Sequence, residues 1–301
     1  MIDYSIIIPH KNTAKSLLRL LGSIPNEKYI QVLIIDDSSD IEVVQHLKSI
    51  QLNNNVQIIF CEFSNGAGGA RNIGIKKAKG KWILFADADD CFTIQINKLL
   101  RENVNVAADI MYFNCDSIDK DGLKSYRHLR YSKLISDFLA DSKKENALKY
   151  YFTPPWSKMI KRDLIVKNNI RFDEIIASND VMFSLKTAFF ARNINANKAI
   201  LYVISLSEGS ITQIISKEHF DAKFSVALNA NRFLCSISMK RYQQSILYFL
   251  GRSYKFGFQY MIYVIFMLIK NKSNIFIGMS KFLNLNKVIR QRENPVYTKK
   301  R

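Results

Sequence analysis

The 301-residue sequence is poor in the side chains that build disulfide frameworks and zinc sites. Its four cysteines are far apart and form no Cys-x-x-Cys pair, and its four histidines are equally scattered. These spacings exclude a disulfide-stapled scaffold and a zinc finger. The sequence also has no Walker loop of the form Gly-x-x-x-x-Gly-Lys-Ser/Thr, which excludes a P-loop nucleotide site.

Long hydrophobic runs are missing as well. The longest apolar stretch covers residues 257–269, with Gln259 as its one polar interruption. A bilayer span needs about 20 such residues, so we expect no membrane crossing. The stretch fits either a buried core helix or an interfacial helix, and the pattern leaves both open. The start, Met1-Ile2-Asp3, shows no signal-peptide pattern, so we expect a cytoplasmic protein.

Acidic residues are scarce near the C-terminus. Residues 240–301 contain 13 Lys or Arg and a single acid, Glu293, and thus hold +12 of the net charge of +18. Such a segment suits an anionic partner: a membrane surface, nucleic acid or a phosphorylated acceptor. No recognised nucleic-acid-binding motif accompanies the charge, so nucleic acid is not expected as a partner. Whether this region contacts the inner face of the plasma membrane, covers an acceptor cleft or meets a second copy of the chain stays open.

The N-terminal part alternates between short apolar runs and segments with helical spacing. The runs predict strands over residues 4–8, 31–35, 56–60, 82–86 and 109–113. Helical periodicity predicts helices over residues 13–23, 41–50, 67–79 and about 93–103. This order predicts an α/β fold whose strands are mostly parallel and joined by helical crossovers, hence a doubly wound sheet.

The pattern changes after Asp116. Residues 120–133 are polar and predict a loop, a helix is predicted to open at Ser178, and a strand over residues 199–204 closes the unit. From Lys217 onward the sequence predicts helices. We therefore predict two units, residues 1–215 and residues 216–301, the second helical and basic.

A buried run that ends in three carboxylates is the most informative feature. Residues 82–86 are apolar, and Asp87, Asp89 and Asp90 follow at the C-terminal edge, where open α/β sheets place their ligands. Three anions this close repel one another unless a cation sits among them, and a divalent ion with substrate phosphates is the natural choice. An acidic turn that caps the next helix is the simpler alternative.

Two other strand ends and one glycine-rich segment point to the same sheet edge. Residues 6–12 and 34–40 end strands with polar groups, and a carboxylate there can bind a nucleobase or ribose, or can cap a helix. Residues 64–72 read Ser-Asn-Gly-Ala-Gly-Gly-Ala-Arg-Asn, which departs from a dinucleotide fingerprint because Arg71 replaces the final glycine. Such a turn at a helix start suits phosphate or sugar hydroxyls. Arg71 then either reaches a ligand or lies on the surface.

These segments together resemble glycosyltransferase family 2, the inverting nucleotide-sugar enzymes with the GT-A fold. The resemblance rests on Ser-Ile-Ile-Ile-Pro-His-Lys-Asn, then Ile-Ile-Asp-Asp-Ser-Ser-Asp, then the ordered run from Ser64 to Asp90. It covers roughly residues 3–205. The residues of these segments are similar to those of bacterial members that build capsule, O-antigen and other surface polysaccharides.

The resemblance implies roles for individual residues on the donor side. Pro9 and Lys11, largely through their backbone, and Asp37 would surround the nucleobase. Arg71 would face the donor, and Asp87 would sit near the ribose or the donor sugar. The metal ligand would be Asp89, holding the Mn²⁺ or Mg²⁺ that bridges the diphosphate. Asp90 would then be a supporting residue or a helix cap.

The family's catalytic base follows an acidic residue at the start of a later helix, usually as Glu-Asp. Here the matching stretch is Ser178-Asn179-Asp180, in which Asn179 replaces the glutamate. The preceding run, Trp-Ser-Lys-Met-Ile-Lys-Arg at residues 156–162, is similar to the family's Trp-Asn-Lys element. The resemblance therefore implies Asp180 as catalytic base. The simpler alternative is a first-turn carboxylate that complements the helix dipole.

The predicted function is a metal-dependent inverting glycosyltransferase. A nucleoside-diphosphate sugar, with UDP favoured, would donate to a hydroxyl of a glycan or polyprenyl-diphosphate-linked acceptor. The alternative is a catalytically inactive nucleotide-sugar-binding scaffold of the same fold.

Overall fold

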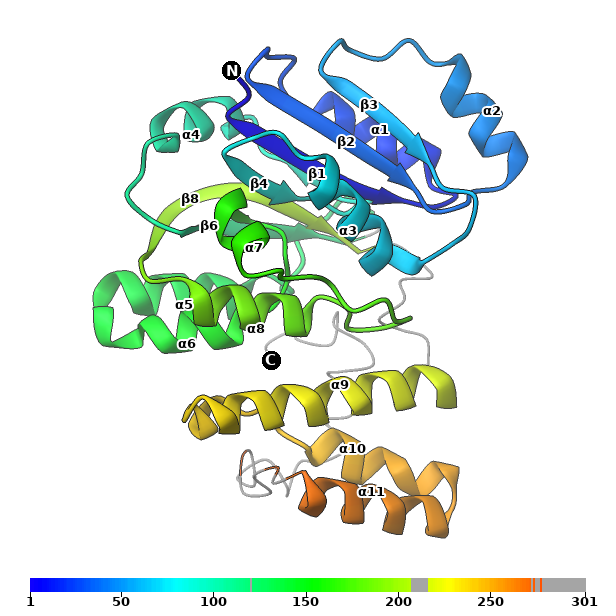
Figure 1. The fold of residues 1–301 in the computed structure, drawn as a ribbon, viewed down its shortest axis with the longest axis vertical. Helices are drawn as coiled ribbons and strands as arrows, with labels where there is room; N and C mark the ends of the chain where they lie inside the picture. Colours follow the sequence, from blue (N-terminus) through cyan, green and yellow to red (C-terminus); the bar gives the residue numbers. More distant parts are fainter. Residues whose placement is uncertain (120, 207–215, 272, 274–276, 278–301) are drawn as a thin grey trace.

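The structure, a computed structural model, describes residues 1–119, 121–206, 216–271, 273 and 277. Its centre is one eight-stranded sheet with the strand order β3-β2-β1-β4-β7-β6-β8-β5. Helices cover the sheet, and three further helices stack beyond them at the far end of the molecule (Figure 1). The acidic strand end lies near the middle of this sheet, on β4.

The first half of the sheet is parallel. It contains β1 (Tyr4–His10), β2 (Ile30–Asp36), β3 (Val56–Phe60) and β4 (Trp82–Phe85). The crossovers run through α1 (Ala14–Gly22), α2 (Ile41–Ser49) and α3 (Gly66–Lys77). The predicted strands and helices of this half are confirmed. The strands β1, β2 and β4 are largely buried on both faces and so read as continuous apolar runs. The edge strand β3 is only half-buried, but four of its five residues are apolar.

The second half of the sheet is mixed. It contains β5 (Cys91–Phe92), β6 (Ile110–Ile118), β7 (Lys158–Lys161) and β8 (Ile194–Ser205). Strand β7 lies antiparallel between β4 and β6, whereas β6 and β8 are parallel. The predicted mostly parallel, doubly wound sheet is therefore confirmed, and β5 and β7 are its antiparallel strands. A four-residue strand with a lysine at each end carries no apolar alternation that could reveal it.

Helices α4 (Ile96–Asn103), α5 (Leu129–Ala140), α6 (Glu145–Tyr151), α7 (Arg162–Lys167) and α8 (Val181–Phe190) complete this unit. The loop predicted for residues 120–133 was wrong at its end, because α5 begins at Leu129. Tyr131 and Ile135 are the two buried side chains of α5. The first turn of the helix also contains Arg130, Ser132 and Lys133, so it continues the polar composition of the loop before it.

One close backbone contact positions the later site. A Cβ on Gly68, near the start of α3, would lie 2.1 Å from the carbonyl oxygen of Asp173. No real Cβ approaches an oxygen so closely, so only glycine lets the chain before α8 lie against α3. The two segments are about a hundred residues apart in sequence, and both carry predicted site residues.

The C-terminal region is helical, as predicted, through residue 271. It contains α9 (Lys217–Ser236), α10 (Leu247–Ser253) and α11 (Phe258–Lys270). These helices share a core of their own, which includes Phe220, Phe224 and Phe249. The opposite side of α9 packs on α8 through a second apolar cluster. The division into two units at residue 215 stays a prediction.

Within the described residues, no helix has both the length and the apolar character that a bilayer crossing requires.

Candidate active site

The carboxylate of Asp87 lies directly after β4 and meets a buried arginine. Its Oδ1 is 2.5 Å from Nη2 of Arg71, and the two side chains are 34% and 7% exposed. The Asp87 backbone N–H donates to the hydroxyl of Tyr202 on β8 (2.8 Å). The predicted companions Arg71 and Asp87 thus face each other, and a surface position for Arg71 is excluded by its burial.

Asp90 supports the turn from inside. It is buried, and its Oδ1 accepts the backbone N–H of Ser205 at 2.7 Å. Burial raises the pKa of the Asp90 carboxyl well above its usual range, and the charges of Asp87 and Asp89 add to this rise. This buried position agrees with a supporting role for Asp90, which stays a prediction.

Asp89 is partly exposed, and its backbone is fixed from another element. Its carbonyl oxygen accepts a hydrogen bond from Nη2 of Arg19 on α1 (2.5 Å), and the same nitrogen donates to Ser205 Oγ. The β4 end is therefore held by α1 and β8 before any ligand arrives. Sequence reasoning missed Arg19 and Tyr202, because both act from distant segments.

The acidic end fits a cation of one particular kind. Among the residues the structure describes, no three His, Cys, Asp or Glu side chains gather into a metal cage. Asp87 and Asp89 nevertheless offer carboxylate oxygens on one short turn. Mg²⁺ is commonly held by one or two carboxylates with substrate phosphates, and oxygen ligands also suit Mn²⁺. The residues fit a cation that binds together with a diphosphate.

Arg71 also reaches the segment before α8. Its Nη1 donates to Oδ1 of Asn179 (2.9 Å), and its guanidinium lies 5.2 Å from the ring centroid of Phe172. Its Nε–H is buried without a hydrogen-bond partner among the described residues. One side chain thus joins the β4 end to the start of α8.

Asn179 replaces the glutamate of the family pattern and keeps a hydrogen bond to Arg71. The amide oxygen of Asn179 accepts the same kind of hydrogen bond from Arg71 that a carboxylate would accept. It brings no negative charge, so the guanidinium charge remains available to Asp87 and Asp180. The substitution keeps the contact and changes the electrostatics.

Asp180 occupies the N-cap position of α8, yet its side chain makes no capping hydrogen bond. Burial raises the pKa of the Asp180 carboxyl. The positive charges of Arg71 and Lys158 oppose this rise, and the negative charge of Asp87 adds to it. The charges of Arg71 and Asp87 at the end of β4 therefore act on the Asp180 carboxylate.

The predicted nucleobase residues gather at a second place, around the start of α3. The carboxylate of Asp37 is buried and accepts from Ser64 Oγ (2.6 Å) and from the backbone N–H of Asn65 (2.7 Å). Lys11 Nζ donates to the same Ser64 hydroxyl (3.1 Å), and Pro9 lies beside them near the end of β1. The structure brings Lys11 and Asp37 together through Ser64, not through the β4 end.

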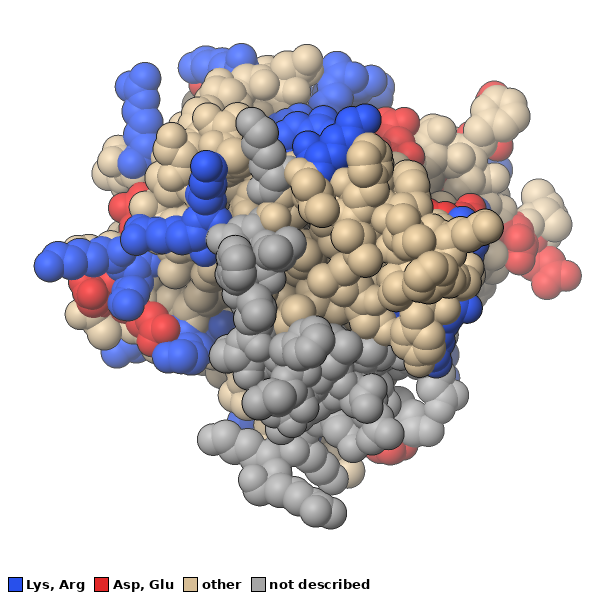
Figure 2. Space-filling model, turned by 90° about the horizontal axis from the view of Figure 1, so that it is seen from below, with Lys and Arg blue, Asp and Glu red and all other residues tan. Residues whose placement is uncertain are grey.

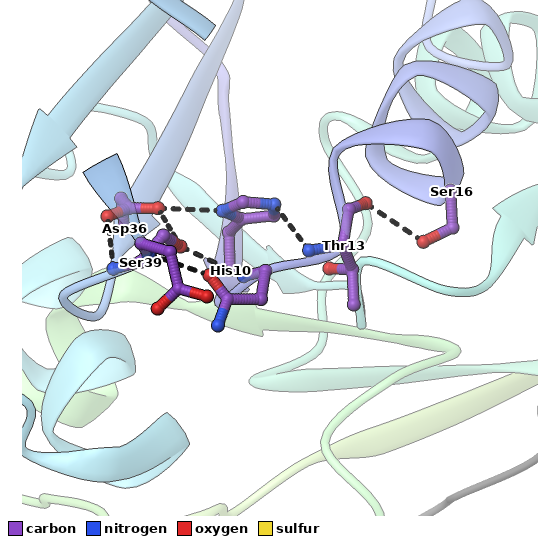
Figure 3. A network of polar contacts seen from close by, with 7 residues as sticks. His10, Thr13, Ser16, Asp36 and Ser39 are labelled. Atoms are coloured by element: carbon purple, nitrogen blue, oxygen red, sulfur yellow. Dashed lines mark hydrogen bonds and ion pairs between the residues drawn. The ribbon is translucent and has the colours of Figure 1, made fainter. Parts of the chain in front are cut away.

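The buried His10 joins the loops that follow β1 and β2, next to Lys11 and Asp37 (Figure 3). The backbone N–H of Thr13 donates to Nε2 of His10, so the ring proton is on Nδ1, which donates to Asp36 Oδ2 (2.8 Å). Asp36 also accepts from the backbone and the hydroxyl of Ser39. Sequence reasoning missed this link between the ends of β1 and β2. Its one signal was a polar pair, His10 and Asp36, that ends two adjacent strands.

A parallel-centred sheet with an acidic β4 end, an arginine beside it and an aspartate opening α8 defines a GT-A-like protein. The fold is similar to that of Staphylococcus aureus TarS residues 1–349 in complex with UDP-GlcNAc, with a TM-score of 0.68. The match covers 98% of this chain and 89% of that one, at 18% identity. A mannosyltransferase of Pyrobaculum calidifontis in complex with GDP-Man and Mn²⁺ matches with a TM-score of 0.54 at 13% identity, over 98% and 82% of the two chains.

Glycosyl transferase family 2 matches residues 5–167, and the chain belongs to this family. A relative is the succinoglycan biosynthesis protein ExoO of Rhizobium meliloti, 26% identical over 233 residues. That alignment covers 73% of this chain and 65% of ExoO. The alignment with the poly(ribitol-phosphate) beta-N-acetylglucosaminyltransferase TarS of Staphylococcus aureus, 25% identical over 210 residues, covers 67% of this chain and 35% of TarS. The chain thus spans less than two thirds of these relatives.

Proposed function

We propose that the chain is a metal-dependent inverting glycosyltransferase of bacterial surface-polysaccharide synthesis. It transfers a sugar from a nucleoside-diphosphate sugar, with UDP favoured, to a hydroxyl of a glycan or polyprenyl-diphosphate-linked acceptor. The observation that carries this is the bridge made by Arg71 between Asp87 at the β4 end and Asn179, next to Asp180. A scaffold that only bound a nucleotide sugar would not require the carboxylate of Asp180 directly after the bridged Asn179.

The donor would lie along the sheet edge, with its base near Pro9, Lys11 and Asp37. Among the residues that the structure describes, each Asp37 oxygen accepts one hydrogen bond, and a carboxylate oxygen has a further lone pair for an N–H or a ribose hydroxyl. The diphosphate would then lie toward Arg71 and the acidic turn. A divalent cation held by Asp89 would offset the charge that develops on the leaving diphosphate.

The residues of α8 would carry out the proton transfer. Asp180 accepts the proton of the acceptor hydroxyl while the oxygen of that hydroxyl bonds to the anomeric carbon. The bond from that carbon to the diphosphate oxygen breaks on the opposite face, and its electron pair leaves with the nucleotide. One displacement inverts the configuration, so an α-linked donor gives a β-glycoside.

A nucleotide-release screen tests the proposal. UDP-, GDP- and dTDP-sugars would each be incubated with Mn²⁺ or Mg²⁺ and a synthetic polyprenyl-diphosphate-linked sugar. We expect acceptor-dependent release from one nucleotide class, with the glycosylated lipid detected by mass spectrometry. Tight nucleotide-sugar binding without turnover on lipid-linked or free glycan acceptors would favour the scaffold alternative.

Replacing Asp89 with Ala should separate metal-dependent from metal-independent donor binding. We expect the variant to bind UDP-sugar about 100-fold more weakly than wild type in Mn²⁺, because a direct ligand is lost. With EDTA present, the two proteins should bind alike. Calorimetry measures both conditions, with Asp121→Ala, an exposed acid on another loop, as control. An unchanged response to Mn²⁺ would remove Asp89 from the metal site.

The acceptor side is proposed to include an anionic membrane surface. Helix α11 exposes one apolar face, with side chains 39–71% exposed: Phe258, Ile262, Ile265, Phe266 and Ile269. Seen from this end, the molecule shows a broad uncharged area with Lys and Arg above it and both basic and acidic side chains at its right edge (Figure 2). Residues 240–271 contain five basic side chains and no acid, which complements an anionic leaflet.

The aromatic residues at this end of the chain divide into two groups. Phe256 and Tyr260 pack on Phe220, at ring-centroid distances of 5.1 and 6.0 Å. Phe258 and Phe266 are 71% and 59% exposed. The outward pair is therefore the one to test.

Changing Phe258 and Phe266 together to Ser should weaken vesicle binding roughly tenfold or more, because two aromatic side chains no longer enter the interface. Flotation with phosphatidylglycerol-containing vesicles measures this, and Phe63→Ser, a single change at a 77% exposed side chain elsewhere, is the control. Vesicle binding equal to wild type would contradict membrane docking. A shift from dimer to monomer in light scattering, with binding unchanged, would assign the face to a second copy.

A further inference from the structure

A cavity of about 190 Å³ lies between the start of α8 and the C-terminal helices. The loop before α8 and the first residue of the helix contribute Ser178 and Val181 to its lining, and α9 contributes Lys223 and Val226. Asp180, the proposed base, lies between Ser178 and Val181, in a turn closed by a hydrogen bond from the Val181 N–H to the Ser178 carbonyl oxygen (3.3 Å). The cavity therefore borders the turn that carries the proposed base.

The cavity lies where two apolar clusters approach each other without merging. Val181 and Val226 belong to the cluster between α8 and α9, and Tyr248 and Phe249 belong to the cluster of the C-terminal helices. Protein interiors are close-packed, so space of this size within a contact between helices calls for an explanation. A void that polar as well as apolar groups line can hold water or a ligand.

Two polar side chains of the lining are available to a ligand. Among the residues that the structure describes, the Ser178 hydroxyl and the Gln244 side-chain amide make no hydrogen bond. The backbone of Gln244 is nevertheless held in place, because its N–H donates to Oδ1 of the buried Asn231 on α9 (2.7 Å) and its carbonyl oxygen accepts from Nδ2 of the same residue (3.2 Å). The wall of the cavity is thus fixed, while its polar side chains keep their capacity for hydrogen bonds.

The lining suits one sugar unit with an attached phosphate. Tyr248 and Phe249 offer aromatic surface to the apolar face of a sugar ring, and the Ser178 hydroxyl and the Gln244 amide can bond to its hydroxyls. Among the described lining residues, Lys223 is the one base and there is no acid, which favours an anionic phosphate. The volume is below the range of about 300–1,000 Å³ for pockets that bind drug-sized ligands, so the cavity suits a single ring and not a longer glycan.

We propose that this cavity is the acceptor subsite: it binds the phosphate-bearing sugar unit of the acceptor and presents one hydroxyl of that sugar to Asp180. The proposal rests on the proposed function, because it requires Asp180 as the base and a sugar as the acceptor. The transfers of the proton and the electron pair are those of the proposed reaction. The proposed donor residues Arg71, Asp87 and Asp89 are not part of the lining, so the two substrates have separate binding places.

Valine-methyl NMR of the full chain locates binding without any transfer reaction. The probes are the 1-phosphates of glucose, galactose, mannose and N-acetylglucosamine, each added with UDP and Mn²⁺ present. We expect at least one probe to shift the methyl signals of Val181 and Val226, assigned by single changes to Ile, and to leave unchanged that of Val264, which is buried on α11 outside the lining. No shift with any of these probes would overturn the proposal. Equal shifts by the unphosphorylated sugars would overturn the proposed ligand class and the role of Lys223.

Ser178→Gly removes a lining hydroxyl without straining the turn, because Ser178 has a left-handed φ of 59° that glycine adopts readily. With the acceptor that supports turnover in the screen above, KM for the acceptor should rise about tenfold, the effect of one lost hydrogen bond. The kcat and the affinity for nucleotide sugar should stay near wild type. Ser238→Gly, at an exposed serine with a φ of 62°, is the matched control and should change none of the three. A fall in kcat with unchanged KM would mean that Ser178 only shapes the turn, and it would contradict the proposal.

Val226→Phe fills the cavity from α9. We expect the Val181 methyl shift to disappear and KM for the acceptor to rise tenfold or more, while the nucleotide sugar binds as in wild type. Ile24→Phe is the control, because it fills another cavity, of about 340 Å³, that no proposed site residue lines. Unchanged acceptor KM and methyl shifts in folded Val226→Phe would overturn the proposal, and Ser178→Gly decides if this variant does not fold. Absence of turnover in wild type would count against the proposed function, whereas the methyl shifts decide the role of the cavity.

Discussion

Replacing Asp180 with Asn should reduce sugar transfer by about 10³-fold, within the range that a general base contributes. The amide cannot accept the proton of the acceptor hydroxyl, so the bond-forming step loses its base. Donor affinity should remain close to wild type, because the Arg71 contacts go to Asp87 and Asn179. Calorimetry with the nucleotide sugar and a product assay measure the two effects separately.

The fold should tolerate this change, which makes the result interpretable. Asp180 sits at an N-cap position without a capping hydrogen bond, and Asn is as good an N-cap residue as Asp. Asp163→Asn, at an exposed carboxylate in the first turn of neighbouring α7, is the matched control and should keep full activity. If Asp180→Asn turned over like the control, Asp180 would be only a first-turn carboxylate.

The wild-type pH profile should carry the same information. Burial raises the pKa of Asp180, so its carboxylate becomes protonated at a higher pH than that of an exposed aspartate. The activity controlled by this group is therefore fully present above the raised pKa and is lost as pH falls through it. In Asp180→Asn the small residual rate should lack this acidic limb. An acidic limb that persisted unchanged in the variant would belong to another group.

How much of the fold the sequence predicts depends on where each strand is buried. The strands β1, β2 and β4 are largely buried on both faces, so short continuous apolar runs identify them, and the edge strand β3 keeps four apolar residues of five. Strand β7 is four residues long, and its lysines hide it. One of them, Lys158, is buried against the carbonyl and ring of Phe152 and against the ring of Tyr112 on β6. Nothing local in the sequence signals that environment.

The site shows the same contrast between local and long-range information. The acidic turn and Arg71 lie within one ordered pattern, and the structure pairs Arg71 with Asp87, as their predicted roles require. The partner Asn179 is 108 residues from Arg71 and read only as a departure from the family pattern. Lys158 lies inside the run 156–162 that is similar to a family element, but its burial arises from contacts with Phe152 and Tyr112 in the folded chain. Sequence spacing identifies residues that lie in the same turn, but not residues from distant segments that meet only in the folded chain.

The second large effect is expected at Arg71. Arg71→Met should lower the free energy of unfolding by about 3 kcal/mol, near the lower end for breaking a buried ion pair, because Asp87 remains partly solvated. The variant leaves Asp87 and the Asn179 amide without their shared donor, and the diphosphate without its arginine. We expect nucleotide-sugar binding to become undetectable by calorimetry. Urea denaturation gives the stability change.

A surface arginine with similar contacts provides the control. Arg101 lies 2.8 Å from Glu27 and 5.5 Å from the ring centroid of Tyr29, but its side chain is 60% exposed. Arg101→Met should therefore change the free energy of unfolding much less than Arg71→Met does, and it should leave donor binding unchanged. Equal losses in the two variants would mean that Arg71 acts only as an ordinary ion-pair partner.

The double variant Arg71→Met/Asp87→Ala separates structure from donor binding. Removing both partners eliminates the unpaired carboxylate, so part of the stability lost in Arg71→Met should return. Donor binding should not return, because the positive charge beside the proposed diphosphate is still missing. Recovery of both would show that Arg71 serves only to compensate Asp87, and it would remove the arginine from the proposed donor site.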